Sequence, residues 1–233
     1  MQAHTAWLSL IMPVLDEGPP LVSALEALAD SRAQGAELIV VDGGSSDDSL
    51  ALARQWADKA LTAPRGRGAQ MNAGAAAAQG QWLIFLHADT RLPPQALQLL
   101  QKLPEHACWG RFDVRIDSPQ RMLAVVSWMM NWRSRLSGIA TGDQAIFVRA
   151  EVFERVGGFP DIALMEDIAL SRKLKAIARP ICLRPAVSTS ARRWLRHGIG
   201  PTIWLMWRLR AAYFFGADPD ALALRYGYRP RSR

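Results

Sequence analysis

The feature of this sequence that most constrains its fold is the alternation of short apolar runs with helix-type stretches in the first 90 residues. The apolar runs have the length and composition of buried strands, and they are Trp7–Val14, Glu37–Asp42 and Gln81–Leu86. The helix-type stretches between them are Pro20–Gln34, Ser46–Trp56 and Gly66–Gln79. A βαβα order of this kind predicts an α/β fold in which helices cover a mostly parallel sheet, with functional groups gathered at the carboxyl ends of the strands.

Beyond Pro93 the pattern is mixed, and no linker or repeat divides the chain. The sequence predicts strands at Cys108–Ile116 and Gln144–Arg149, helices at Gln120–Ser137 and Asp167–Ala178, and a mostly helical end after Ser190. The character of the chain changes near residue 185. We therefore expect a catalytic domain over residues 1–185 and a basic Arg- and Trp-rich helical segment over residues 186–233, packed on the same domain.

The formal net charge of +7 is concentrated at one end of the chain. Between Arg184 and Arg233 ten arginines stand against two aspartates, whereas the preceding residues are close to neutral. Two cysteines, Cys108 and Cys182, exclude a multi-disulfide framework, and no Cys or His pair has zinc-site spacing. No targeting segment or bilayer-length apolar run is recognisable, so the sequence predicts a cytoplasmic protein.

Polar groups follow three of the apolar runs, and in a parallel sheet they would meet at one edge. The first run leads into Pro13, Asp16 and Glu17, the second into Asp42 and the turn Gly43–Ser46, and the third into His87–Asp89. The glycines of the turn would let backbone approach an anion or nucleotide closely, and Asp42 could hold a ribose or a base edge. A P-loop and a dinucleotide fingerprint are both absent from the sequence.

Two acidic positions are candidates for chemistry. Asp89 could hold Mg²⁺ or Mn²⁺ together with the phosphates of a substrate, since these ions need only one or two protein carboxylates. A metal bound to a diphosphate would stabilise it as a leaving group. The pair Glu166 and Asp167 could provide a partly desolvated general base. Each of these acids could also simply cap a helix.

The motifs quoted above, together with Gly142–Gln144 and Gly157–Pro160, resemble those of family 2 inverting glycosyltransferases of the GT-A fold over about residues 7–180. Within that family, Gly66–Gly74 and Leu86–Thr90 are most similar to the bacterial radical-SAM/selenodomain-associated transferases. The resemblance implies that a sugar moves from a nucleoside-diphosphate sugar to an acceptor hydroxyl with inversion, assisted by a divalent cation, Mn²⁺ or Mg²⁺. The acceptor is not identified, and no nucleic acid partner is expected.

The resemblance also implies roles for single residues. Asp167, with Glu166 beside it, would be the catalytic base, and Asp143 would lie in the acceptor region. Asp89 corresponds to the last acid of the metal motif D-x-D, with His87 where the first acid usually stands. Arg192, Arg193 and Trp194 resemble the end of the Q-x-x-R-W motif, and Ser190 stands in place of its glutamine, which argues against processive polymer synthesis. The nucleotide-sugar-binding set is Pro13, Glu17, Asp42, Gly44, Arg67, Gln70, Ala88, Arg192, Arg193 and Trp194.

A different class of function fits the basic end of the chain. Cations and aromatics alternate from Arg192 to Arg210, as they do in interfacial helices and in single-strand binders. The alternative hypothesis is therefore a basic membrane-surface or nucleic-acid-binding module with a degenerate transferase site. We expect residues 199–215 to associate peripherally with anionic membrane, on the inner face of the cell membrane. A nucleotidyltransferase is disfavoured, because no glycine-rich basic loop follows the first strand.

Overall fold

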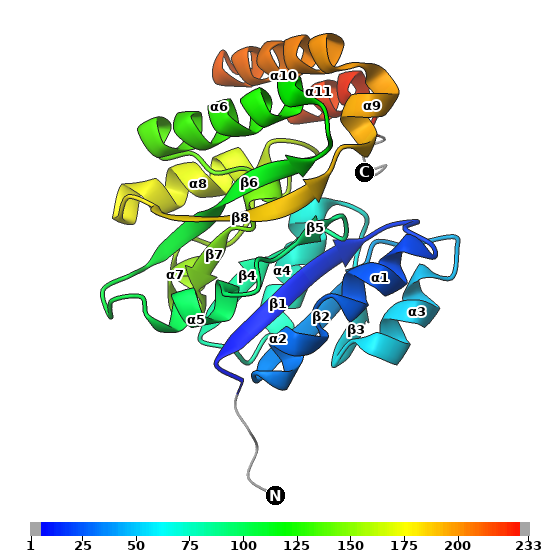
Figure 1. Ribbon diagram of the computed structural model, residues 1–233, viewed down its shortest axis with the longest axis vertical. Coiled ribbons are helices and arrows are strands. Elements are labelled where there is room, and N and C mark those ends of the chain that lie inside the picture. Colours follow the sequence, from blue (N-terminus) through cyan, green and yellow to red (C-terminus); the bar gives the residue numbers. More distant parts are fainter. Residues whose placement is uncertain (1–5, 229–233) are drawn as a thin grey trace, which may run out of the picture.

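The computed structural model describes residues 6–228, and a curled mixed sheet forms its centre (Figure 1). The sheet order is β3-β2-β1-β4-β7-β6-β8-β5. The strands are β1 (Leu8–Val14), β2 (Ala36–Asp42), β3 (Lys59–Thr62), β4 (Trp82–Phe85), β5 (Thr90–Arg91), β6 (Trp109–Asp117), β7 (Phe147–Arg149) and β8 (Ile181–Ser190). The pairings β3-β2, β2-β1, β1-β4 and β6-β8 are parallel, and the other three are antiparallel. The predicted α/β class is confirmed.

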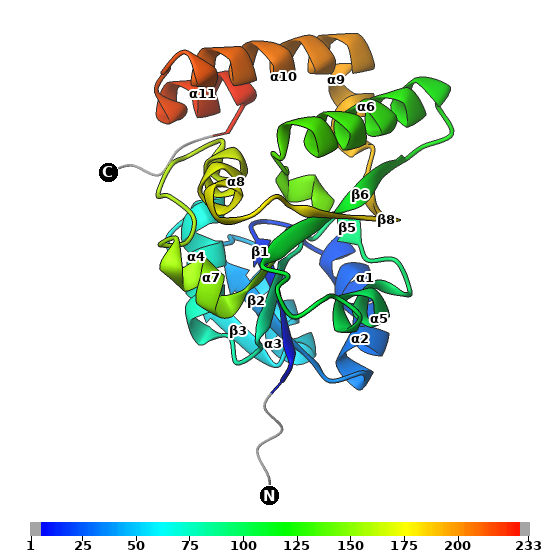
Figure 2. The same ribbon diagram turned by 90° about the vertical axis from the view of Figure 1, so that its left-hand side faces the viewer.

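Helices cover both faces of the sheet because successive side chains of a strand point to opposite sides. In β1, Leu8, Leu10, Met12 and Val14 belong to one core cluster and Ile11 to another. The first cluster is covered by α1 (Pro20–Glu26), α2 (Ala29–Ala33), α3 (Ser49–Trp56) and α5 (Ala96–Gln101). The second is covered by α4 (Arg67–Ala77), α7 (Ala150–Arg155) and α8 (Glu166–Ile177). Figure 2 shows these layers edge on.

The remaining helices stack above the carboxyl-end side of the sheet (Figures 1 and 2). They are α6 (Arg121–Ser137), α9 (Arg192–His197), α10 (Ile199–Phe214) and α11 (Pro219–Tyr226). One apolar cluster joins Leu209 of α10 and Leu222 of α11 to Ile168 of α8. Another joins Leu123 and Val126 of α6 to the first turns of α10. The C-terminal helices are therefore packed on the rest of the chain by apolar contacts.

Strand β8 differs most from the sequence pattern. The sequence shows no strand there, because Pro185 cannot donate a ladder hydrogen bond and Arg184 interrupts the apolar run. The sheet accommodates both residues in a bulge: Phe112 pairs with Leu183, and the next residue, Asp113, pairs with Ala186. The strand continues across this bulge, so residues 185 and 186, where the sequence pattern changes, both lie inside β8. The basic helices begin only at Arg192.

The predicted helix Pro20–Gln34 is wrong as one element, because it is two short helices. α1 ends at Glu26 and α2 begins at Ala29. Leu21, Leu25 and Leu28 nevertheless belong to one buried cluster, as their i, i+4, i+7 spacing would also allow on a single helix. Strand β3 also lacks a clear sequence signal, since Lys59–Thr62 is only partly buried at the edge of the sheet.

Candidate active site

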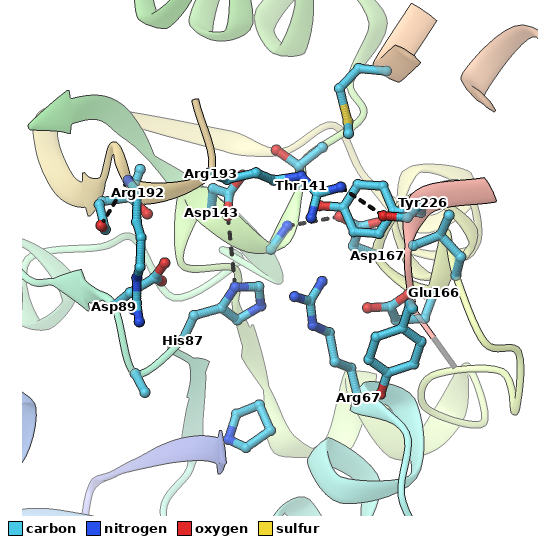
Figure 3. Close-up of a pocket in the computed structure, with 18 of the residues that line it drawn as sticks. Arg67, His87, Asp89, Thr141, Asp143, Glu166, Asp167, Arg192, Arg193 and Tyr226 are labelled. Atoms are coloured by element: carbon cyan, nitrogen blue, oxygen red, sulfur yellow. Dashed lines mark hydrogen bonds and ion pairs between the residues drawn. The ribbon is translucent and has the colours of Figure 1, made fainter. Parts of the chain in front are cut away.

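A cavity of about 500 Å³ opens at the carboxyl ends of β1 and β4 and is roofed by the C-terminal helices (Figure 3). Most of the residues predicted for the site line this one cavity, although they come from distant parts of the chain. They are Pro13, Glu17, Arg67, Gln70, His87, Ala88, Asp89, Asp143, Glu166, Asp167, Arg192, Arg193 and Trp194.

Asp42 and Gly44 are not among the residues that line the cavity. Asp42 is 2% exposed, and its carboxylate accepts hydrogen bonds from the backbone N–H groups of Gly44 and Ser45 at 2.8 and 2.9 Å. It also accepts from the Ser45 hydroxyl. Because these donors occupy its oxygens, the Asp42 side chain shapes the turn after β2.

Gln70 lines the cavity but its amide nitrogen points into the fold. From α4 it donates to the carbonyls of Val14 and Val41, both at 2.8 Å, and it is 2% exposed. A Cβ on Gly43 would lie 2.9 Å from the Gln70 side chain, so glycine is needed for this close approach. Gln70 therefore ties the end of β1, where Pro13 and Glu17 lie, to the end of β2.

Arg67 and Glu166 form the charged centre of the cavity. Glu166 is 4% exposed at the start of α8, and burial together with the neighbouring Asp167 raises its pKa to about 7. Burial alone would lower the pKa of Arg67. The negative charges of Glu166, Tyr226 and Asp143 outweigh this effect, so the pKa is raised. Near neutral pH, Glu166 thus exchanges its proton readily while Arg67 keeps its charge.

Asp167 is held in place by the loop before β7. Its Oδ2 accepts a hydrogen bond from the backbone N–H of Gly142 at 2.8 Å, and its Oδ1 accepts from Ile168 at 2.7 Å. Met165 precedes this turn in the left-handed conformation with a φ of 70°, which is costly for a residue with a Cβ and redirects the chain as it enters α8. The carboxylate is partly exposed and faces the cavity (Figure 3).

His87 and Asp143 lie next to each other in the wall of the cavity. Their Nδ1 and Oδ1 atoms are 3.7 Å apart. Burial and the nearby Arg67 lower the pKa of His87 to about 4, so the imidazole is neutral at neutral pH. The Asp143 side chain is 48% exposed, and its partial burial raises its pKa. A neutral imidazole nitrogen can accept a hydrogen bond or serve as a metal ligand.

The opposite end of the cavity carries an exposed acid, Asp89, and an exposed cation, Arg192. Asp89 is exposed and lies near Arg192 (Figure 3). The guanidinium of Arg192 is 4.0 Å from the Glu17 carboxylate. Burial raises the pKa of Glu17, Arg192 opposes this shift, and the charge of Asp89 adds to it. Residues 6–228 contain no cluster of three His, Cys, Asp or Glu side chains suited to a metal ion. Asp89 could therefore hold a Mg²⁺ or Mn²⁺ ion only if oxygen atoms of a bound ligand complete the coordination shell of the ion.

Several residues of the site could not be found by sequence reasoning. Tyr226 lies nearly 60 residues after the Glu-Asp pair, yet Arg193 stacks on its ring at 3.5 Å and donates to its carbonyl at 2.8 Å. Thr141, Arg210 and Tyr228 also line the cavity. No motif marks Arg210, Tyr226 and Tyr228, because the packing of α10 and α11 on α8 brings them there. Trp194 lines the cavity and also packs with α6.

The arrangement of the sheet and its helices is that of the GT-A class of glycosyltransferases. S. aureus TarS residues 1–349, solved with UDP-GlcNAc, superposes with a TM-score of 0.61 at 18% identity, over 78% of this chain and 58% of that chain. The mannosyltransferase PcManGT from Pyrobaculum calidifontis, solved with GDP-Man and Mn²⁺, gives a TM-score of 0.63 at 19% identity, over 95% of this chain and 69% of that chain.

Residues 9–149 match the family described as "Glycosyl transferase family 2", and the chain belongs to that family. An undecaprenyl-phosphate 4-deoxy-4-formamido-L-arabinose transferase of Pseudomonas syringae pv. syringae is 28% identical over 163 residues, 62% of this chain and 47% of its own length. A PGL/p-HBAD biosynthesis glycosyltransferase of Mycobacterium bovis is 34% identical over 91 residues, 36% of each chain. This chain thus spans about half, or less, of the curated relatives it matches.

Proposed function

We propose that this protein is an inverting glycosyltransferase that moves a sugar from a nucleoside-diphosphate sugar to an acceptor hydroxyl. One observation carries the proposal. A single cavity has the exposed carboxylate of Asp89 beside Arg192 at one end, where a diphosphate would bind, and the anchored carboxylate of Asp167 at the other (Figure 3). Inverting transfer needs these two functions on opposite sides of the reacting carbon.

Separate residues accept the proton and stabilise the leaving group. Asp167 accepts the proton of the acceptor hydroxyl as its oxygen forms a bond to the anomeric carbon of the sugar. On the opposite face the bond from that carbon to the diphosphate oxygen breaks, and the nucleoside diphosphate leaves with the electron pair. Arg192 and Arg193 stabilise the developing negative charge. A divalent cation held by Asp89, with His87 beside it, would supply further charge neutralisation at the diphosphate.

The donor class is supported by the solved structures of the same fold, which contain UDP-GlcNAc and GDP-Man, the latter with Mn²⁺. The ends of β1 and β4 supply the walls for the nucleoside through Pro13, Glu17 and Ala88. Within the family, Gly66–Gly74 and Leu86–Thr90 support membership of the radical-SAM/selenodomain-associated subgroup. Ser190, in place of the glutamine of the Q-x-x-R-W motif, argues against processive polymer synthesis.

Replacing Asp89 with Ala is expected to weaken metal-dependent nucleotide binding by at least about tenfold, because the site has few other hard oxygen ligands. Thermal stabilisation by UDP-, GDP- and dTDP-sugars in the presence of Mn²⁺ measures this. The wild-type protein should be stabilised by one of these sugars, and the Asp89→Ala protein by much less. Asp117→Ala, which removes an exposed carboxylate from the end of β6, is the matched control. Equal nucleotide affinity in all three proteins would contradict the metal site, and stabilisation by oligonucleotides alone would contradict the transferase proposal.

We also propose that the C-terminal helices rest on an anionic bilayer surface. Most of the exposed large apolar side chains lie on α6 and α10, among them Trp128 (61% exposed) and Trp204 (63% exposed). The two helices lie side by side in both views (Figures 1 and 2) and are joined by a shared apolar cluster. Neither contains an acidic residue. Within residues 6–228 no helix is long and apolar enough to cross a membrane.

Binding to vesicles that contain anionic lipid is expected at low salt and should weaken as salt is added, since each arginine near such a surface contributes about 1 kcal/mol. The double variant Trp204→Ser/Trp207→Ser should lower the partition coefficient at least about tenfold. Ile177→Ser removes an exposed apolar side chain from α8 and should leave binding unchanged. Sedimentation with vesicles measures both. If the wild-type protein does not bind anionic vesicles at low salt, the proposed contact of Trp204 and Trp207 with a bilayer is wrong.

A further inference from the structure

The side chain of Arg193 is fixed in the wall of the cavity by Tyr226, the last residue of α11 (Figure 3). The guanidinium carbon of Arg193 lies 3.5 Å from the centre of the Tyr226 ring. Its Nη2 donates a hydrogen bond to the Tyr226 carbonyl at 2.8 Å. Stacking on the ring sets the plane of the guanidinium, and the hydrogen bond sets its rotation within that plane. Tyr226 therefore determines both the position and the orientation of this cation.

The Tyr226 carbonyl is available to Arg193 because α11 ends at this residue. The last carbonyls of a helix have no partner within the helix. Gly227 ends α11 in the left-handed conformation, with a φ of 83°, and its N–H turns back to the carbonyl of Leu224 at 3.1 Å. The helix itself is anchored by Leu222, which is 1% exposed in the apolar cluster shared with α8 and α10. The negative end of the helix dipole also favours a cation at this place.

The contacts with Tyr226 orient Arg193 but leave its charge uncompensated. A carbonyl and an aromatic ring carry no net charge, and burial raises the pKa of Tyr226, so its phenol is neutral at neutral pH. By contrast, Arg111 and Arg135 are both paired with the carboxylate of Asp113. The Nε of Arg193 is buried and has no hydrogen-bond partner among residues 6–228. Because a buried donor without a partner costs free energy, this group is suited to a ligand that brings an acceptor.

Arg192, the neighbouring cation, is held less firmly than Arg193. Its side chain is 62% exposed, and its guanidinium is 4.0 Å from the Glu17 carboxylate. An exposed arginine loses rotamer freedom when it binds a ligand, and this loss weakens binding. Arg193 has already lost that freedom on folding, so an anion that binds to it meets a preorganised group.

We propose that Tyr226 is a positioning residue of the transferase site, which holds Arg193 in place for the diphosphate of the nucleotide donor. This inference rests on the proposed function, which assigns Arg193 to the leaving group. The role of Tyr226 is indirect, since it acts through the guanidinium that it orients. Helix α11 lies outside residues 9–149, which match the family, so a segment beyond that match completes the donor end of the cavity.

Calorimetry in the presence of Mn²⁺ tests the inference, with UDP, GDP or dTDP as the probe, whichever belongs to the sugar that stabilises the protein. Tyr226→Leu removes the ring and keeps the backbone carbonyl, and it should weaken binding of the diphosphate at least about tenfold. Tyr226→Phe keeps the ring and should bind like wild type. The matched control is Tyr213→Leu on α10, which removes a ring 5.3 Å from the guanidinium of Arg172. Tyr213 is not among the residues that line the cavity, so this variant should keep wild-type affinity.

A double variant distinguishes positioning from a general effect on the fold. Arg193→Gln should itself weaken binding at least about tenfold, and adding Tyr226→Leu to it should weaken binding by less than about twofold more, because the second residue acts through the first. Arg193→Lys keeps the charge but cannot stack as a planar group, so it should also bind the diphosphate at least about fivefold more weakly. This variant tests the inference even if Tyr226→Leu does not fold.

Four outcomes would overturn the inference. They are wild-type affinity in Tyr226→Leu, wild-type affinity in Arg193→Lys, independent losses that multiply in the double variant, and an equal loss in Tyr213→Leu. Failure of the wild-type protein to bind any of the three nucleoside diphosphates would instead overturn the proposed function, so the two failures are distinguishable.

Discussion

Replacing Asp167 with Asn is expected to lower the rate of sugar transfer at least about 100-fold while leaving nucleotide-sugar binding intact. Removal of a general base typically costs 10² to 10⁴ in rate, or roughly 3 to 5 kcal/mol of transition-state stabilisation. The amide oxygen of Asn can still accept the hydrogen bond from Gly142, so the loop before β7 should keep its position. Single-turnover transfer under saturating donor measures the loss directly.

Glu166→Gln is the matched control for this prediction. Glu166 is the neighbouring acid, buried and with a pKa raised to about 7 by burial and by Asp167, so it is partly neutral at neutral pH. Its amide variant imitates that neutral form and should lose far less activity than Asp167→Asn. A greater loss in Glu166→Gln would transfer the role of base to Glu166. Unfolding of Asp167→Asn would show instead that the carboxylate serves mainly to anchor the start of α8.

Gly110→Ala is expected to destabilise the protein by about 3 kcal/mol, the upper part of the range for overpacking a core. Gly110 lies in β6 between β7 and β8, where it pairs with Phe147 and Ile181. A Cβ there would lie 2.2 Å from the Ile181 carbonyl oxygen and 2.4 Å from the Phe147 ring. Neither neighbour can move without opening the centre of the sheet. Urea unfolding should show the loss, which corresponds to a melting temperature lower by about 6–12 °C.

The matched control is Gly200→Ala, the same substitution in the first turn of α10. A Cβ at Gly200 has no neighbouring atom within 4 Å, and alanine favours helix more than glycine does. This variant should therefore be as stable as wild type or more stable by up to about 1 kcal/mol. A Gly110→Ala protein with wild-type stability would show that β6 and β8 are less tightly paired than their geometry indicates.

The local chemistry of the first half of the chain could be predicted from the sequence. Apolar runs of strand length followed by helix-type stretches specify parallel pairing, so the acids after β1, β2 and β4 were expected at one edge of the sheet. Asp89 and Glu17 do line the cavity there. Asp42 comes from an equally strong pattern, yet its carboxylate turns back onto Gly44 and Ser45. Sequence spacing places a residue at an edge, but the hydrogen bonds of its own turn decide which way its side chain points.

The sequence by itself determined the class of fold, the family motifs and the acids available for chemistry, because strand periodicity and glycine-rich turns are local properties. Only the tertiary structure decided how those acids behave. Glu166 and His87 owe their shifted pKa values to burial and to Asp167 and Arg67 respectively. Packing also places the helices that cover the cavity. Apolar contacts between segments far apart in the chain hold α10 and α11 against α8, and these two helices carry Arg210 and Tyr226. Electrostatics depends on distance in space, and no pattern along the chain records that distance.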